Sequence, residues 1–247
     1  MSLIRHHFRS DVLSLSTSMS VILPDADPGP DGYATLYLLH GLTDDDTAWV
    51  RFSGIERYAA TRGLAVIMPQ VHRSFYCDEA HGNRYWTFLT QELPVLAHRT
   101  YPLTTHRART FVAGLSMGGY GAMKWALREP ERFAAAASLS GALGLAQRTT
   151  PGAGSLDPNL WDHIFDGRSV VGSDDDAIEL VRRAGGAADL PKLYVCCGTD
   201  DALFAENDAF IQAADQAGIA VTTAFGPGLH DWDYWDRKIT DVLAWLP

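Results

Sequence analysis

One serine lies between two glycines in a context typical of a catalytic nucleophile. The pentapeptide Gly114-Leu115-Ser116-Met117-Gly118 follows a short apolar run that predicts a strand and precedes a segment that predicts a helix. A serine at the tip of such a tight turn needs small neighbours, because larger side chains would crowd the backbone. The N-terminus of the following helix would direct the Met117 N–H at an oxyanion. The motif by itself is also compatible with a glycine-rich turn that packs a helix on a sheet.

An acid and a base follow the serine in the chain order that a serine hydrolase requires. Asp200 and Asp201 come directly after a predicted buried strand over residues 192–197, and His230 follows a second predicted strand over residues 220–225. Neighbours on an extended loop point in different directions, so only one of the two aspartates can reach the imidazole. We expect Asp201 to be the acid, with Asp200 as the alternative.

A further apolar run, over residues 34–39, leads into His40-Gly41-Leu42. This is the position from which such enzymes take a second oxyanion donor, which we expect to be the Leu42 N–H. His40 is expected to shape this turn and His81 to face the pocket. Four features therefore agree in kind and order, and they favour a serine hydrolase over a sheet scaffold with accidental matches.

The elements that position these residues alternate between strand-like and helix-like segments. Strands are expected over residues 34–39, 64–69, 110–113 and 134–140, and helices over residues 54–61, 86–99 and 119–128. This alternation predicts an α/β fold with a mostly parallel central sheet and helices on both faces. We expect residues 1–247 to form one domain, with residues 141–190 as an insertion of loops and short helices near the active-site edge.

Composition limits the classes of partner. The chain has 247 residues, of which 47% are hydrophobic, and a formal net charge of −10. Nucleic acids and anionic membrane surfaces bind clustered lysine and arginine, so the charge argues against both, and its simplest role is solubility. No apolar run approaches the ~20 residues that span a bilayer, and residues 1–10 lack the apolar core of a signal peptide. We therefore expect a cytoplasmic protein.

The three cysteines cannot all pair. Cys196 and Cys197 are adjacent in a predicted strand, where their side chains face opposite sides of the sheet. They are expected to act as small apolar residues in a reducing compartment, with a redox switch beside the acid loop as the alternative. No Cys/His spacing suggests a zinc site, and we expect neither a metal nor a cofactor.

Motifs from about residue 10 to the C-terminus carry a family resemblance. The chain resembles the esterase D-like α/β-hydrolases, and within them the bacterial tributyrin esterases and S-formylglutathione hydrolases. The resemblance implies the α/β-hydrolase fold, with Ser116 as nucleophile, Asp201 as acid and His230 as base. Asp44-Asp45-Asp46 and residues 147–160 depart from the family pattern. The motifs are Leu39-His40-Gly41-Leu42, Trp49, Ile55-Glu56-Arg57-Tyr58, Ser74-Phe75-Tyr76, Arg84-Tyr85-Trp86-Thr87-Phe88, Glu92-Leu93-Pro94, Gly114 to Gly121, Cys197-Gly198-Thr199, Pro227 to Trp232, and Trp235-Asp236.

These features predict a serine carboxylesterase that hydrolyses short-chain acyl esters through an acyl-enzyme. Tyr76 and Trp86 are expected to line the substrate pocket. The alternatives are an S-formylglutathione hydrolase, an acetyl or feruloyl esterase of carbohydrates, an acyltransferase, and a catalytically silent fold that serves as a binding module. The expected partner is a small-molecule ester, and the composition is compatible with a monomer and with a homo-oligomer.

Overall fold

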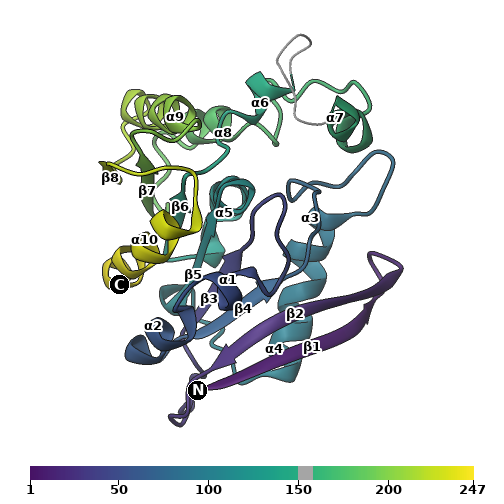
Figure 1. The fold of residues 1–247 in the computed structure, drawn as a ribbon, viewed down its shortest axis with the longest axis vertical. Coiled ribbons are helices and arrows are strands. Elements are labelled where there is room, and N and C mark those ends of the chain that lie inside the picture. Colours follow the sequence, from purple (N-terminus) through teal and green to yellow (C-terminus); the bar gives the residue numbers. More distant parts are fainter. Residues whose placement is uncertain (150–157) are drawn as a thin grey trace.

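The computed structural model describes residues 1–149 and 158–247, and within them eight strands form one sheet in the order β1-β2-β4-β3-β5-β6-β7-β8. The six strands β3 to β8 run parallel to one another, whereas β1 and β2 form an antiparallel hairpin along one edge (Figure 1). The predicted α/β architecture is confirmed. The strands are β1 (Ser2–Ser10), β2 (Leu15–Leu23), β3 (Thr35–Leu39), β4 (Ala65–Pro69), β5 (Thr110–Leu115), β6 (Ala135–Leu139), β7 (Lys192–Gly198) and β8 (Val221–Gly226).

Helices cover both faces of the sheet and bury a separate apolar core on each. One core lies under α1, α2 and α10, and the other lies under α4, α5, α8 and α9. The helices are α1 (Ala48–Phe52), α2 (Ile55–Arg62), α3 (Tyr85–Thr87), α4 (Leu93–Thr100), α5 (Met117–Arg128), α6 (Leu145–Arg148), α7 (Pro158–Phe165), α8 (Ala177–Arg183), α9 (Phe204–Gln216) and α10 (Trp232–Trp245). No helix in the described ranges is long and apolar enough to cross a bilayer.

The structure adds one strand that was not predicted and interrupts one predicted helix. The polar N-terminus is a strand, because Ile4, His6 and Phe8 alternate with exposed residues and turn toward the core side. The helix expected over residues 86–99 is interrupted by a π-helical turn over Phe88–Glu92. Pro94 follows this turn and has no N–H to donate to the carbonyl four residues earlier, so regular α-helical bonding cannot continue through it.

The described part of the segment 141–190 contains the short helices α6, α7 and α8, while residues 150–157 lie outside the described structure. Figure 1 places α6 and α7 at one end of the molecule, beyond the carboxyl ends of the parallel strands. Each aspartate of the acidic run 174–176, which precedes α8, has a partner. Asp174 pairs with Arg183, Asp175 pairs with Lys124, and the Asp176 side chain caps α8 by accepting the Glu179 N–H.

Candidate active site

Ser116 occupies the strained turn between β5 and α5. Its backbone has φ 52° and ψ −117°, in the left-handed half of the Ramachandran plot that a serine rarely adopts. A Cβ on Gly118 would lie 2.3 Å from the Leu39 carbonyl oxygen, and one on Gly114 would lie 2.3 Å from the Gly118 oxygen. Both flanking glycines are therefore required by close backbone contacts, as the motif predicts.

A hydrogen-bonded chain joins Ser116, His230 and Asp201. His230 Nδ1 lies 2.9 Å from Asp201 Oδ2 and 3.0 Å from Oδ1, and His230 Nε2 lies 3.0 Å from Ser116 Oγ. Since an ionised carboxylate only accepts hydrogen bonds, Nδ1 must carry the proton in the neutral imidazole. Nε2 then accepts the hydroxyl hydrogen of Ser116, which is the arrangement that a general base requires.

The structure brings Asp201, and not Asp200, to the histidine. The Asp201 side chain is buried, and its Oδ1 also accepts the Leu203 N–H at 2.8 Å. Burial alone would raise the pKa of Asp201, but hydrogen bonds from His230, Leu203 and Ser140 outweigh it and hold the pKa below its usual value. Asp200 is exposed. Asp201 therefore remains ionised beside the imidazole.

Backbone contacts fix the acid loop against the histidine loop. A Cβ on Gly198 would lie 2.1 Å from the Gly228 oxygen, so the two loops are packed backbone to backbone. The Thr199 N–H donates to the Gly226 oxygen at 2.8 Å, which continues the β7–β8 pairing past the strand ends. The Trp235 ring meets the His230 imidazole edge to face at 4.9 Å. These contacts hold the imidazole plane in a fixed orientation.

The predicted oxyanion donors belong to two segments, the start of α5 and the loop that follows β3. Met117 is the first residue of α5, and Leu42 follows Gly41, where an added Cβ would lie 3.8 Å from Ser116 Cβ. Residues 41–42 therefore pass directly beside the predicted nucleophile. N–H groups at the start of a helix and in such a turn are suited to stabilising negative charge on a carbonyl oxygen.

His40 holds this turn in place. Its Nδ1–H donates to the Gly41 oxygen at 2.7 Å, while its Nε2 accepts the Val71 N–H at 3.2 Å. Burial lowers the pKa of His40, so the ring stays neutral and can make both bonds. The structure thus agrees with the expectation that His40 shapes the oxyanion turn.

The acidic run beside this turn, which departs from the family pattern, has structural partners. Asp44 Oδ2 accepts the Gly41 N–H at 3.3 Å, and Asp46 accepts hydrogen bonds from the hydroxyls of Ser18 and Ser20 at 2.9 and 2.8 Å. The run therefore ties the oxyanion turn to β2.

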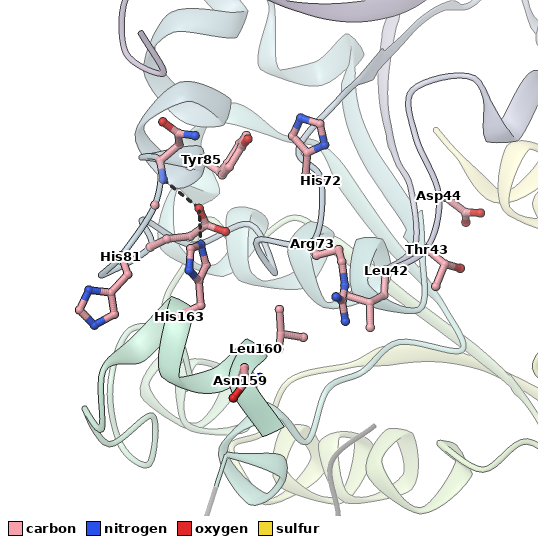
Figure 2. Close-up of a pocket in the computed structure, with 13 residues that line it drawn as sticks. Leu42, Thr43, Asp44, His72, Arg73, His81, Tyr85, Asn159, Leu160 and His163 are labelled. Atoms are coloured by element: carbon pink, nitrogen blue, oxygen red, sulfur yellow. Dashed lines mark hydrogen bonds and ion pairs between the residues drawn. The ribbon is translucent and has the colours of Figure 1, made fainter. Parts of the chain in front are cut away.

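A wide cavity of about 770 Å³ opens beside the oxyanion turn (Figure 2). Most of its lining residues have polar or charged side chains, and His81 is one of them, as expected. Inside it, Glu79 Oε2 accepts one hydrogen bond from the Asn83 N–H at 2.8 Å and lies 3.6 Å from His163 Nε2. The lining residues are Leu42, Thr43, Asp44, His72, Arg73, Glu79, His81, Gly82, Asn83, Tyr85, Asn159, Leu160 and His163. Hydrogen-bonding side chains of this kind can bind the polar groups of a substrate.

Tyr76 and Trp86, which were predicted to line the substrate pocket, are not among the residues that line this cavity. Tyr76 is fully buried, and its Oη donates to the His40 carbonyl oxygen at 2.9 Å, which leaves the side chain no surface to offer a substrate. Trp86 lies outside the cavity. Its ring instead contacts two cations, with Lys124 Nζ at 4.5 Å and Arg128 Cζ at 4.3 Å from the ring centre.

The sequence analysis did not single out several residues that line this cavity. His72 and Arg73 face the cavity from the loop that follows β4, and Tyr85 contacts His72 edge to face at 5.9 Å (Figure 2). This loop has a positive φ at His72 (50°), Phe75 (49°) and Tyr76 (52°). None of these residues is a glycine, so no residue type in the sequence marks the strained turn that directs the loop inward.

Within residues 1–149 and 158–247, no three His, Cys, Asp or Glu side chains are arranged so that they could hold a metal ion.

Known proteins are similar to this chain over nearly its whole length. The Esterase family model matches residues 10–246. The acetyl esterase of Caldicellulosiruptor saccharolyticus is 30% identical over 263 residues, which cover 100% of this chain and 98% of the relative. Among solved structures, the substrate-bound fluorophosphonate-binding serine hydrolase FphF of Staphylococcus aureus is 33% identical, with a TM-score of 0.90 over 99% of this chain and 98% of its own. The S-formylglutathione hydrolase FrmB of Staphylococcus aureus is 34% identical, with a TM-score of 0.88 over the same shares.

Proposed function

Because the chain belongs to the Esterase family and is an ester hydrolase with the α/β-hydrolase fold, we propose that it is a serine carboxylesterase for short-chain acyl esters, close to the bacterial tributyrin esterases. The observation that carries the proposal is the hydrogen-bonded chain from Ser116 through His230 to Asp201. The full-length similarity to an acetyl esterase supports a short acyl group.

The proposed mechanism follows from the orientation of this chain. Ser116 Oγ attacks the ester carbonyl carbon while His230 Nε2 takes the hydroxyl proton, and Asp201 stabilises the imidazolium that forms. The N–H groups of Leu42 and Met117 bind the oxygen as it becomes negative. The imidazolium then gives its proton to the leaving alkoxide, and a water molecule repeats the sequence on the acyl-enzyme.

The residues that line the cavity favour a substrate with a polar leaving group. It adjoins Leu42, so a substrate whose carbonyl oxygen is held by the oxyanion turn would reach it. Hydrogen-bonding side chains such as Asn83, Tyr85 and His163 line it, and these suit hydroxyl groups of a small alcohol or a sugar.

A thioester of glutathione is the second candidate substrate. Arg73 and three histidines, His72, His81 and His163, line the cavity of a chain whose formal net charge is −10. Arg73 and the imidazole N–H groups can donate hydrogen bonds to the carboxylates of a glutathione thioester, while Asp44 and Glu79 line the same cavity as acceptors. The similarity to an S-formylglutathione hydrolase supports this candidate.

We also propose that residues 1–247 form one domain, since every residue of this mechanism lies in or directly after a turn or loop that follows a strand of the same sheet. A cytoplasmic location is part of the same proposal. Cys77, Cys196 and Cys197 are all free and buried, which suits a reducing compartment.

Hydrolysis of p-nitrophenyl esters from acetate to octanoate, with S-formylglutathione as a parallel substrate, tests the assignment. We expect kcat/KM to peak between acetate and butyrate, and the Ser116→Ala variant to be inactive on every substrate. A strong preference for the thioester would reassign the enzyme to the second candidate. Activity retained by a folded Ser116→Ala variant would refute the mechanism.

A further inference from the structure

Three tryptophans form a continuous aromatic cluster that ends at the predicted general base. The tryptophan cluster consists of Trp49 on α1 and of Trp232 and Trp235 on α10. The rings of Trp49 and Trp232 meet edge to face with their centres 5.1 Å apart, and those of Trp232 and Trp235 do so at 5.4 Å. The Trp235 ring then meets the His230 imidazole at 4.9 Å. A chain of ring contacts therefore leads from α1 to His230.

The start of α10 places two of these rings side by side. His230 lies two residues before the helix, and the N-cap residue Asp231 accepts the Tyr234 N–H at 2.9 Å. The Trp235 N–H donates to the Asp231 oxygen at 3.2 Å, which begins the helical bonding. Trp232 and Trp235 are three residues apart, and side chains with this spacing are neighbours on a helix surface. The capped helix start thus fixes both rings relative to His230.

The other end of the tryptophan cluster reaches the oxyanion turn. Trp49 is fully buried, and its Nε1–H donates to the Leu39 oxygen at 3.1 Å. Leu39 ends β3 and directly precedes residues 40–42. A Cβ on Gly118 would lie 2.3 Å from the same oxygen, so this carbonyl group also lies against the start of α5. The cluster therefore joins the segment that carries His230 to the backbone that carries the predicted oxyanion donors.

Trp232 is the member that connects the two ends. Its ring contacts Trp49 and Trp235, and Phe52 also contacts it at 5.2 Å. The face of an aromatic ring is negative and its edge is positive, so an edge-to-face contact restricts how each ring tilts against the next. Among the ring contacts of the described residues, Trp232 reaches His230 through Trp235. An effect of Trp232 on the imidazole is therefore indirect.

We propose that Trp232 is a positioning residue for both sides of the proposed active site. Through Trp235 it fixes the His230 imidazole, and through Trp49 it fixes the oxyanion turn. The proposal rests on the proposed function, in which His230 is the general base and Leu42 supplies an oxyanion donor. These groups act on one carbonyl group at the same time and come from distant parts of the chain, so a rigid link keeps both within reach of the substrate.

Steady-state kinetics of Trp232→Leu and Trp232→Phe with p-nitrophenyl acetate test the proposal. Leucine keeps an apolar side chain but removes the ring contacts, and a small misplacement of catalytic groups costs up to about a hundredfold in rate. We therefore expect kcat of Trp232→Leu to fall by about tenfold to a hundredfold, with KM changed by less than about twofold. Phenylalanine keeps an aromatic ring at this position, so Trp232→Phe should recover most of the lost kcat.

Fluorophosphonate labelling separates positioning from a folding defect in Trp232→Leu. Every folded molecule should still accept one phosphonyl group, so the labelled fraction at completion should equal that of wild type. The labelling rate should fall in parallel with kcat, because phosphonylation also needs the general base and the oxyanion donors. A reduced labelled fraction whose members react at the wild-type rate would assign Trp232 to packing alone and overturn the proposal.

Trp245→Leu is the matched control. Trp245 lies on the same helix, but its ring contacts Tyr194 at 5.2 Å and its Nε1–H donates to Thr222 Oγ1 at 3.2 Å. These partners lie on β7 and β8, so this variant should match wild type in kcat and in labelling rate. Wild-type kcat in Trp232→Leu, a loss confined to KM, or an equal loss of kcat in Trp245→Leu would contradict the proposal. Wild-type protein that hydrolyses no ester, or that is not labelled at Ser116, would instead refute the proposed function itself.

Discussion

The buried ammonium of Lys124 donates to the carbonyl oxygen of Tyr76 at 2.9 Å, and the Tyr76 hydroxyl in turn donates to the carbonyl oxygen of His40 at 2.9 Å. A cation on α5 therefore supports the oxyanion turn through one tyrosine. Lys124 Nζ also lies 2.5 Å from Asp175 Oδ1, which attaches the loop before α8 to the same point. The oxyanion turn and part of the insertion thus share one buried charge.

Replacing Lys124 by methionine should destabilise the protein strongly. The substitution leaves the Asp175 carboxylate and the Tyr76 carbonyl without their donor, and breaking a buried pair in this way costs about 3–5 kcal/mol. Urea unfolding measures the loss. Lys238→Met is the control, because Lys238 pairs with Asp241 on the surface, where such pairs contribute less than about 1 kcal/mol. Equal losses in the two variants would contradict the role given to Lys124.

Asp175 should make stability depend on pH in the acid range. Burial raises its pKa, but the Lys124 ammonium outweighs burial and holds the pKa below its usual value. A carboxyl group with a lowered pKa in the folded state stabilises the protein above its unfolded pKa of about 3.9, and this stabilisation is lost as the pH falls further. Unfolding free energies of wild type and Asp175→Asn should therefore differ most above pH ~4 and converge below it. A difference that is constant across this range would exclude the charge as its cause.

The two neighbouring aspartates should differ sharply in their effect on turnover. Asp201→Asn removes the carboxylate that fixes the His230 tautomer, and we expect kcat to fall by up to ~10⁴-fold. Asp200→Asn changes an exposed side chain and should leave kcat near its wild-type value. Parallel kinetics on one ester give the ranking, and the reverse order would transfer the acid role to Asp200.

Gly118 should tolerate no side chain. A Cβ there would lie 2.3 Å from the Leu39 oxygen, and backbone must move to relieve that contact. We expect Gly118→Ala to lose about 1–3 kcal/mol of stability, together with much of the esterase activity, because the shift displaces Ser116. Gly226→Ala is the control, since a Cβ at that position meets nothing within 4 Å. Thermal unfolding in which both variants match wild type would disprove the steric argument.

The sequence predicts those parts of the site that depend on residue type and spacing. Ser116 lies between glycines that the turn requires, and His230 and Asp201 follow apolar runs long enough to be recognised as strands. Their meeting follows from topology, because parallel strands end at one edge of a sheet. Local chemistry therefore predicts the hydrogen-bonded chain from the sequence.

The cavity could not be predicted in the same way. His72 faces it because the loop after β4 has a strained backbone at non-glycine residues, which nothing in the sequence marks. Tyr76 appeared suited to the pocket because aromatic residues often line one, yet its hydroxyl finds a buried carbonyl partner in His40. Side-chain direction in an irregular loop depends on tertiary contacts, whereas residue periodicity does not apply there.

Covalent labelling with a fluorophosphonate, located by peptide mass spectrometry, tests most directly that His230 activates Ser116. We expect the wild-type protein to carry one phosphonyl group on the peptide that contains Ser116. The His230→Ala variant should be labelled at least about a hundredfold more slowly, because a general base contributes about 10²–10⁴-fold. Absence of label from folded wild-type protein, attachment at another residue, or equally fast labelling of His230→Ala would contradict the account.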